Sequence, residues 1–115
     1  MPRERVTLSG LLEELRPGDL VGIYSLEGGL AEYLQVAESG EDGMRLGWLG
    51  KDEFIKHVTG ILERSMDVVI GVSRGESLAG FYLFSLRRNR DGASFLVGRR
   101  FTDEEVEAIL RVSNT

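Results

Sequence analysis

Short apolar segments separated by tight-turn signals constrain the fold of this chain most. Glu27-Gly28-Gly29, Arg74–Ser77 and Asn89–Gly92 each join two apolar runs with too few residues between them for a crossover helix. Strands joined by such short turns pair antiparallel. The apolar runs predict six strands, over residues 19–26, 30–37, 44–49, 67–73, 78–86 and 94–100.

Three amphipathic segments flank these strands and predict helices. Residues 7–16 place four leucines on one helical face, with Thr7 as the N-cap. A second helix begins near Gly50 and contains Gly60, which predicts close packing or fraying at that position. The third helix opens with Thr102-Asp103-Glu104-Glu105, the pattern of a capping box. The element order α-β-β-β-α-β-β-β-α predicts one α+β domain over residues 1–115, with an antiparallel sheet of about six strands and three helices.

The apolar positions of these elements predict the hydrophobic core. Residues 78–86 are apolar at alternate and intervening positions alike, which is typical of a strand covered on both faces. Trp48 is a candidate for either the core or an interface. The predicted core residues are Leu11, Leu15, Val21, Ile23, Val36, Phe54, Val58, Ile61, Val69, Phe81, Leu83, Phe95, Val106, Ile109 and Leu110.

The two halves of the chain also share a weak sequence repeat, which we call the echo, at an offset of 48 residues. Five residues of the first hairpin have identical counterparts in the second: Asp19, Val21, Ser25, Leu30 and Ala31 match Asp67, Val69, Ser73, Leu78 and Ala79. Duplication of an α-β-β-β unit explains the match, and so does chance similarity between two hairpins, which we favour.

Composition excludes several classes of function. The chain has no cysteine and one histidine, so it has no disulfide, no thiolate site and no multi-histidine metal site. We therefore predict no metal, no cofactor and no catalytic residues.

A net charge of −5 argues against general nucleic-acid binding. No apolar run approaches the roughly 18 residues of a membrane span and no signal peptide is recognisable, so a cytoplasmic location is expected. The preference for arginine over lysine is typical of a thermophile or of a GC-rich genome.

One short motif resembles a catalytic one. Gly71-Val72-Ser73-Arg74-Gly75 matches the G-x-S-x-G nucleophile elbow, which exposes its serine between a strand and a helix. Here a strand is predicted to follow, and the single histidine, His57, precedes the serine. A hairpin turn is the favoured interpretation, and a small hydrolase using Ser73 is kept as an alternative.

The most concentrated charge is an arginine set around the last predicted hairpin. Arg87, Arg88, Arg90, Arg99 and Arg100 are candidates for an anion or nucleic-acid site. Strand alternation, however, directs Arg87 and Arg88 to opposite faces, and hairpin pairing separates them from Arg99 and Arg100. A set of solvated charges that protects a sheet edge is therefore the favoured interpretation.

The element order resembles the Roadblock/LC7 family of profilin-like regulatory domains. The corresponding parts are Thr7–Arg16, Asp19–Ala37, Gly50–Arg64, Asp67–Arg100 and Thr102–Val112, and the strand predicted at Met44–Leu49 is an addition to that order. The order is also similar to that of small acidic secretion chaperones. Both resemblances imply a non-catalytic, dimeric protein that binds another protein, for example a small GTPase. An adaptor of this kind is the function we expect, with an anion binder and a hydrolase as alternatives.

Overall fold

The computed structural model describes residues 5–25, 29–39, 43–47 and 49–113. It is an α+β fold with an antiparallel sheet and three helices, which confirms the predicted class. Trp48 lies outside the described residues. The elements in chain order are α1 (Leu8–Glu14), β1 (Leu20–Ser25), β2 (Gly29–Ser39), β3 (Gly43–Leu46), α2 (Lys51–Ser65), β4 (Asp67–Arg74), β5 (Ser77–Arg88), β6 (Ser94–Arg100) and α3 (Asp103–Ser113).

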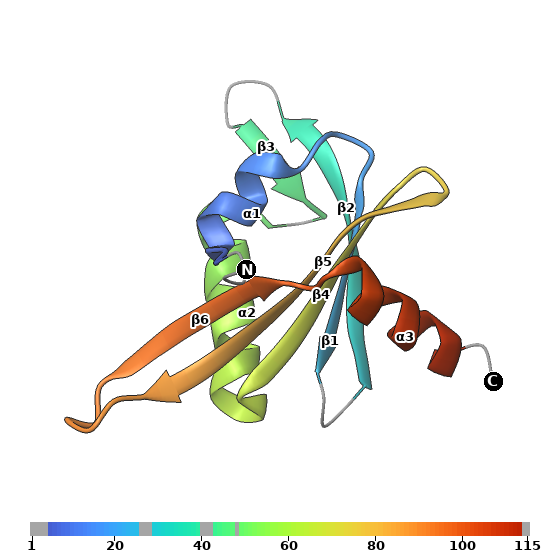
Figure 1. Cartoon of the computed structure of the whole chain (residues 1–115). Coiled ribbons are helices and arrows are strands. Elements are labelled where there is room, and N and C mark those ends of the chain that lie inside the picture. The colour runs from blue at the N-terminus through green and yellow to red at the C-terminus, as the bar shows by residue number, and fades with distance from the viewer. Residues whose placement is uncertain (1–4, 26–28, 40–42, 48, 114–115) are drawn as a thin grey trace.

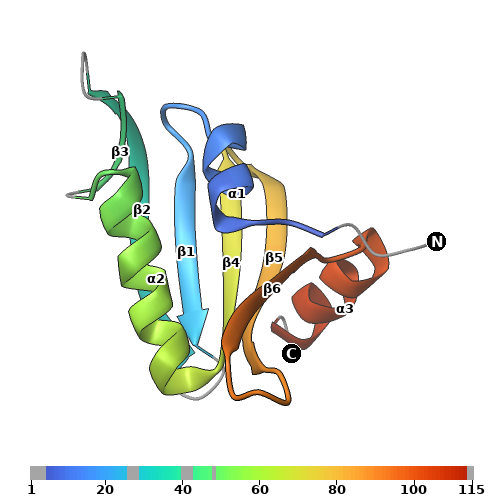
Figure 2. The same cartoon turned by 90° about the vertical axis from the view of Figure 1, so that its left-hand side faces the viewer.

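The strands form one sheet in the order β3-β2-β1-β4-β5-β6, and all neighbours are antiparallel. Helices α1 and α2 lie together on one face, which we call the α1/α2 face (Figures 1 and 2). Helix α3 lies on the opposite side, and we call that side the α3 face (Figure 1). Because each chain half folds into a meander and β1 pairs with β4, the sheet joins two three-stranded units side by side.

Local signals explain where the helices begin. The Thr7 hydroxyl accepts a hydrogen bond from the Gly10 N–H group at 2.9 Å, as expected of an N-cap. Helix α2 begins after Gly50, as predicted. The predicted capping box of α3 is confirmed: the Glu105 N–H group donates to the Thr102 hydroxyl at 3.2 Å, and the Thr102 N–H group donates to the Glu105 carboxylate at 3.0 Å.

The hydrophobic core fills the space between the sheet and the first two helices. Strand residues that pair directly point to the same face, so Val21 and Val72 lie on the α1/α2 face together with Ile23 and Ile70. All four side chains are almost completely buried. Nine residues predicted to belong to the core are buried, as expected: Leu11, Leu15, Val21, Ile23, Val36, Phe54, Val58, Ile61 and Val69.

Several core predictions were wrong because the sequence does not show which face of a strand is covered. Phe95 is 46% exposed. Phe81, Leu83 and Val106 are half-buried, since they lie on the α3 face or on α3 itself. The core takes Tyr82 and Phe84 from β5 instead. Residues 78–86 are therefore fully covered on one face only. The side chains of Ile109 and Leu110 lie outside the described part of the structure.

Two local predictions also need correction. The strand predicted over residues 44–49 ends at Leu46, because Gly47 has a φ of +60° and the chain turns back there. Leu46 and Leu49 then exchange two backbone hydrogen bonds of 2.8 and 2.9 Å. Gly60 lies within the continuous helix α2, and a Cβ atom added to it would meet no atom within 4 Å. Close packing therefore does not explain this glycine.

Candidate functional site

A buried carboxylate organises the turn between α1 and β1. Asp19 is only 1% exposed, and Arg74 from the end of β4 donates to both of its oxygens, through Nε and Nη2, at 2.9 Å each. The Arg16 N–H group donates to the same carboxylate at 2.9 Å. The hydrogen bonds from Arg74 hold the pKa of Asp19 below its usual range, and outweigh the burial that raises it. Asp19 thus fixes the positions of Arg74 and of the backbone at Arg16.

A second polar contact connects α1 to the middle of β5. Tyr82 is buried on the α1/α2 face, and its hydroxyl donates to the Glu14 carboxylate at 3.1 Å. Arg100, opposite Tyr82 in β6, places its guanidinium carbon 5.6 Å from the centre of the Tyr82 ring. Its Nη2 atom donates to the Ala79 carbonyl at 3.1 Å. Arg100 is therefore held beside Tyr82, and one of its five N–H donors bonds to the Ala79 carbonyl.

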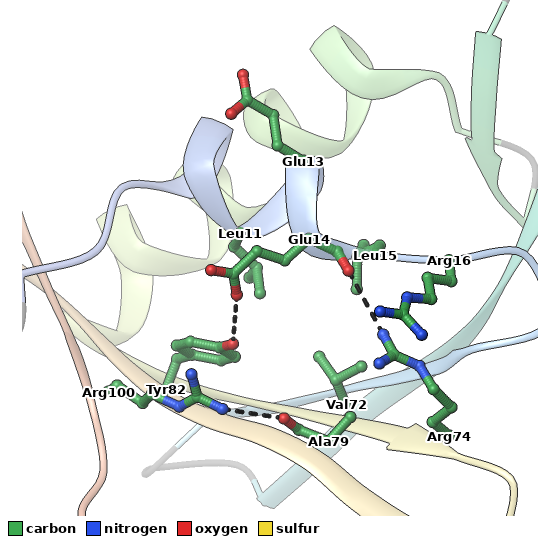
Figure 3. Close-up of a pocket in the computed structure, with 10 residues that line it drawn as sticks. All are labelled: Leu11, Glu13, Glu14, Leu15, Arg16, Val72, Arg74, Ala79, Tyr82 and Arg100. Carbon is green, nitrogen blue, oxygen red and sulfur yellow. Dashed lines mark hydrogen bonds between the residues drawn. The ribbon is translucent and has the colours of Figure 1, made fainter.

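These side chains surround a cavity of about 420 Å³ between α1 and the strands β4 and β5. Figure 3 shows the Arg16 and Arg74 guanidinium groups next to each other at one end, and Arg100 below the Tyr82 ring at the other. The apolar part of the lining consists of Leu11, Leu15, Val72 and Ala79. The cavity therefore combines Arg16, from the turn after α1, with Arg74 of β4 and Arg100 of β6, and a smaller part of its wall is apolar.

The structure does not bring the predicted arginine set together. Arg99 and Arg100 pair with the middle of β5, whereas Arg87 and Arg88 lie opposite Phe95 and Ser94 near the far end of the hairpin. Arg88 and Arg90 are exposed. Arg87 forms an ion pair with Asp67, at 3.6 Å between nitrogen and oxygen. Of the five, only Arg100 lines the cavity.

Arg99 has a separate role on the α3 face. Its Nη1 atom donates to the Glu105 carboxylate at 3.1 Å, and its guanidinium carbon lies 4.7 Å from the centre of the Phe101 ring. The hydrogen bond from Arg99, together with that from the Thr102 N–H group, lowers the pKa of Glu105 to about 2. These contacts anchor the first turn of α3 to β6, so Arg99 is committed to the fold.

The segment that matches the nucleophile elbow is a hairpin, as predicted. Strand β4 ends at Arg74, Gly75 has a φ of +63°, and β5 begins at Ser77. Ser73 pairs with Leu20, on the α3 face, whereas His57 belongs to α2 on the other side of the sheet. The geometry therefore offers no serine–histidine pair at this position.

The outer edge of β6 is a further distinctive surface. Strand β6 is the last in the sheet, and Figure 1 shows its hairpin with β5 projecting beyond the other strands. Phe95, Leu96 and Val97 are exposed by 46%, 41% and 41%. The Val6 N–H group donates to the outward-facing Gly98 carbonyl at 3.0 Å. Because alternate residues of a strand direct their backbone groups to the same side, the N–H and C=O groups of Leu96 also point outward.

Sequence reasoning did not find the cavity, because its residues are distant in the chain. Asp19 and Arg74 were assigned only to the start of a strand and to a turn, and Arg16 only to the end of a helix. Their one shared signal is that each is a charged residue at the end of an element, and the antiparallel pairing of β1 with β4 brings those ends together.

No protein-family model, curated protein or solved structure matches this chain. No described helix has both the length and the apolar character needed to cross a membrane. Among the described residues, no group of three or more histidine, aspartate and glutamate side chains is placed to hold a metal ion.

Proposed function

We propose that this chain is a small non-catalytic adaptor protein that forms a homodimer through the edge of β6 and binds a partner protein. The observation that carries the proposal is the exposed apolar run Phe95-Leu96-Val97 on a projecting edge strand. An edge strand with outward backbone donors and acceptors pairs readily with another strand.

A second copy of the chain fits this edge. Two antiparallel β6 strands centred near Leu96 bring their apolar runs together. Arg5 and Val6 already pair with the outer edge at Arg99 and Gly98, so this pairing is confined to Phe95–Val97. The apolar run is present on both copies, and this self-complementary centre favours self-association.

The α3 face supplies a surface for the partner protein. Phe81 and Leu83 are half-buried there, and a cavity of about 250 Å³ lies between β5 and α3, next to Phe81 and Val106. Antiparallel pairing of two edges leaves the α3 faces of both copies on the same side of the extended sheet. The Roadblock resemblance makes a small GTPase the first partner to test.

Sedimentation equilibrium of the whole chain tests the dimer. We expect a dimer for the wild type and dissociation on Val97→Lys, since the charge would be placed within the paired edges. Leu78→Lys is the matched control, because Leu78 is 42% exposed and lies at the other end of β5. A monomeric wild type, or a dimer that survives Val97→Lys, would refute the proposal.

Affinity capture from native lysate with wild type, Val97→Lys and Leu78→Lys then tests the adaptor role. One protein captured by the wild type and by Leu78→Lys, and reduced with Val97→Lys, is the expected result for a partner of the dimer. Equal capture by all three variants would separate partner binding from β6.

A further inference from the structure

We propose that the cavity between α1, β4 and β5 is a binding site for a small organic monoanion, with a carboxylate group held by Arg16 and Arg74 and an apolar part against Leu11, Leu15 and Val72. This site does not use the Phe95–Val97 edge of β6, so an experiment that refutes the adaptor proposal leaves this one untouched, and the reverse also holds.

The N–H donors that Arg16 and Arg74 do not use within the chain show where the anion would bind. Each guanidinium group has five N–H donors. Arg74 uses Nε and Nη2 on Asp19 and on the Glu14 carbonyl, which leaves its Nη1 atom. The Arg16 side chain makes no hydrogen bond or ion pair with the described part of the chain, and it lies beside Arg74 in Figure 3. Two adjacent guanidinium groups with unused donors form a geometry that suits a carboxylate.

The charge balance favours a ligand with a single negative charge. Arg16, Arg74 and Arg100 line the cavity, and the carboxylates next to them are those of Asp19 and Glu14. Three positive and two negative groups leave one uncompensated positive charge. Glu13 also lines the cavity, but its carboxylate points away from it in Figure 3. A dianion or a polyphosphate would therefore be less well matched than a monocarboxylate.

The shape of the cavity favours an organic anion over an inorganic one. A volume of about 420 Å³ exceeds the space that a carboxylate group alone would fill. The side chains of Leu11, Leu15 and Val72 line the cavity but are at most 5% exposed, so the apolar part of the wall is small. A short aliphatic chain is sufficient to cover this small apolar surface, while its carboxylate remains at the Arg16 end.

The site is also largely preformed. Asp19 holds the Arg74 guanidinium through two hydrogen bonds, and the Tyr82 hydroxyl holds the Glu14 side chain. A preformed site loses less conformational entropy when a ligand binds. Only Arg16 would need to become ordered, because its side chain is exposed.

Titration of the ¹⁵N-labelled chain with 4-methylpentanoate, followed by NMR, tests the site. We expect saturable shifts of the signals around Arg16 and Arg74, with a dissociation constant on the order of 1 mM. The uncharged analogue 4-methylpentan-1-ol should bind at least about tenfold more weakly, because it lacks the carboxylate. Added salt should weaken binding of the acid but not of the alcohol.

Two variants decide whether the arginines are responsible. Arg16→Gln should weaken binding at least about tenfold, and Arg88→Gln, at an exposed position near the hairpin end, should leave it unchanged. Arg100→Gln provides a second test that does not disturb the pair between Arg74 and Asp19. Absence of saturable shifts in the wild type, equal binding of the acid and the alcohol, or wild-type affinity in Arg16→Gln would overturn the proposal.

Discussion

Gly98→Ala is the substitution whose effect the structure determines most directly. A Cβ atom at Gly98 would overlap with the Val6 carbonyl oxygen and would lie 2.5 and 2.7 Å from two ring carbons of Phe84. Phe84 is almost completely buried and cannot move away, so the segment at Val6 has to leave β6. Overpacking costs about 1–3 kcal/mol and the lost hydrogen bond between Val6 and Gly98 about 1 kcal/mol.

We therefore expect Gly98→Ala to lower the free energy of unfolding by about 2–4 kcal/mol, or the thermal midpoint by roughly 8–16 °C. Circular dichroism during heating and urea denaturation measure both quantities. Gly60→Ala is the matched control with the opposite sign. Its Cβ atom meets nothing within 4 Å inside a helix, so alanine should stabilise by about 0.5–1 kcal/mol. Unchanged or increased stability of Gly98→Ala would refute the reasoning.

Two further substitutions test other parts of the structure. Asp19→Asn should lower the urea midpoint at pH 7, and the difference from wild type should shrink as the pH falls. The lowered pKa of Asp19 means that its stabilisation is present above its unfolded pKa of about 4 and is lost as the pH falls through the folded pKa. Parallel pH profiles of variant and wild type would contradict this. Leu96→Pro removes an N–H group that points away from β5, so we expect a folded chain, by circular dichroism, that no longer dimerises in sedimentation equilibrium. A dimer that persists would show that β6 pairing is not its basis.

The fold class was predictable because it depends on local signals. Thr7, Gly50 and the Thr102–Glu105 capping box each determine a helix start within a few residues, and the short turns require antiparallel pairing. The covered face of β5 was not predictable. Phe81 and Leu83 are as apolar as Tyr82 and Phe84, so only the position of α1 and α2 decides which pair is buried.

The cavity was not predictable for a related reason. The arginines close together in sequence were separated by strand alternation and hairpin register, whereas Arg16, Arg74 and Arg100 converge from the α1–β1 turn, β4 and β6. Their convergence depends on two long-range pairings, β1 with β4 and β5 with β6. Sequence spacing is informative within one element, but it carries no information about which elements become neighbours.

The sheet itself tests the 48-residue echo between the two halves of the chain. A twofold axis perpendicular to the sheet that keeps each side chain on its own face passes through one directly opposed pair, and the separation of that pair is then the offset between all equivalent residues of the two strands. In β1 and β4, Ile23 pairs with Ile70 and Gly22 with Gly71, which are separations of 47 and 49 residues.

All such separations between β1 and β4 are odd, and an even offset therefore reverses the two faces. The echo matches Val21, on the α1/α2 face, with Val69, which pairs with Tyr24 on the α3 face. If the two halves were superposed with the 48-residue offset, side chains on the α1/α2 face of β1 would match side chains on the α3 face of β4. The symmetry of the molecule thus lies in its strand order, with β1 and β4 at the centre, and the identical residues at the 48-residue offset do not occupy equivalent positions.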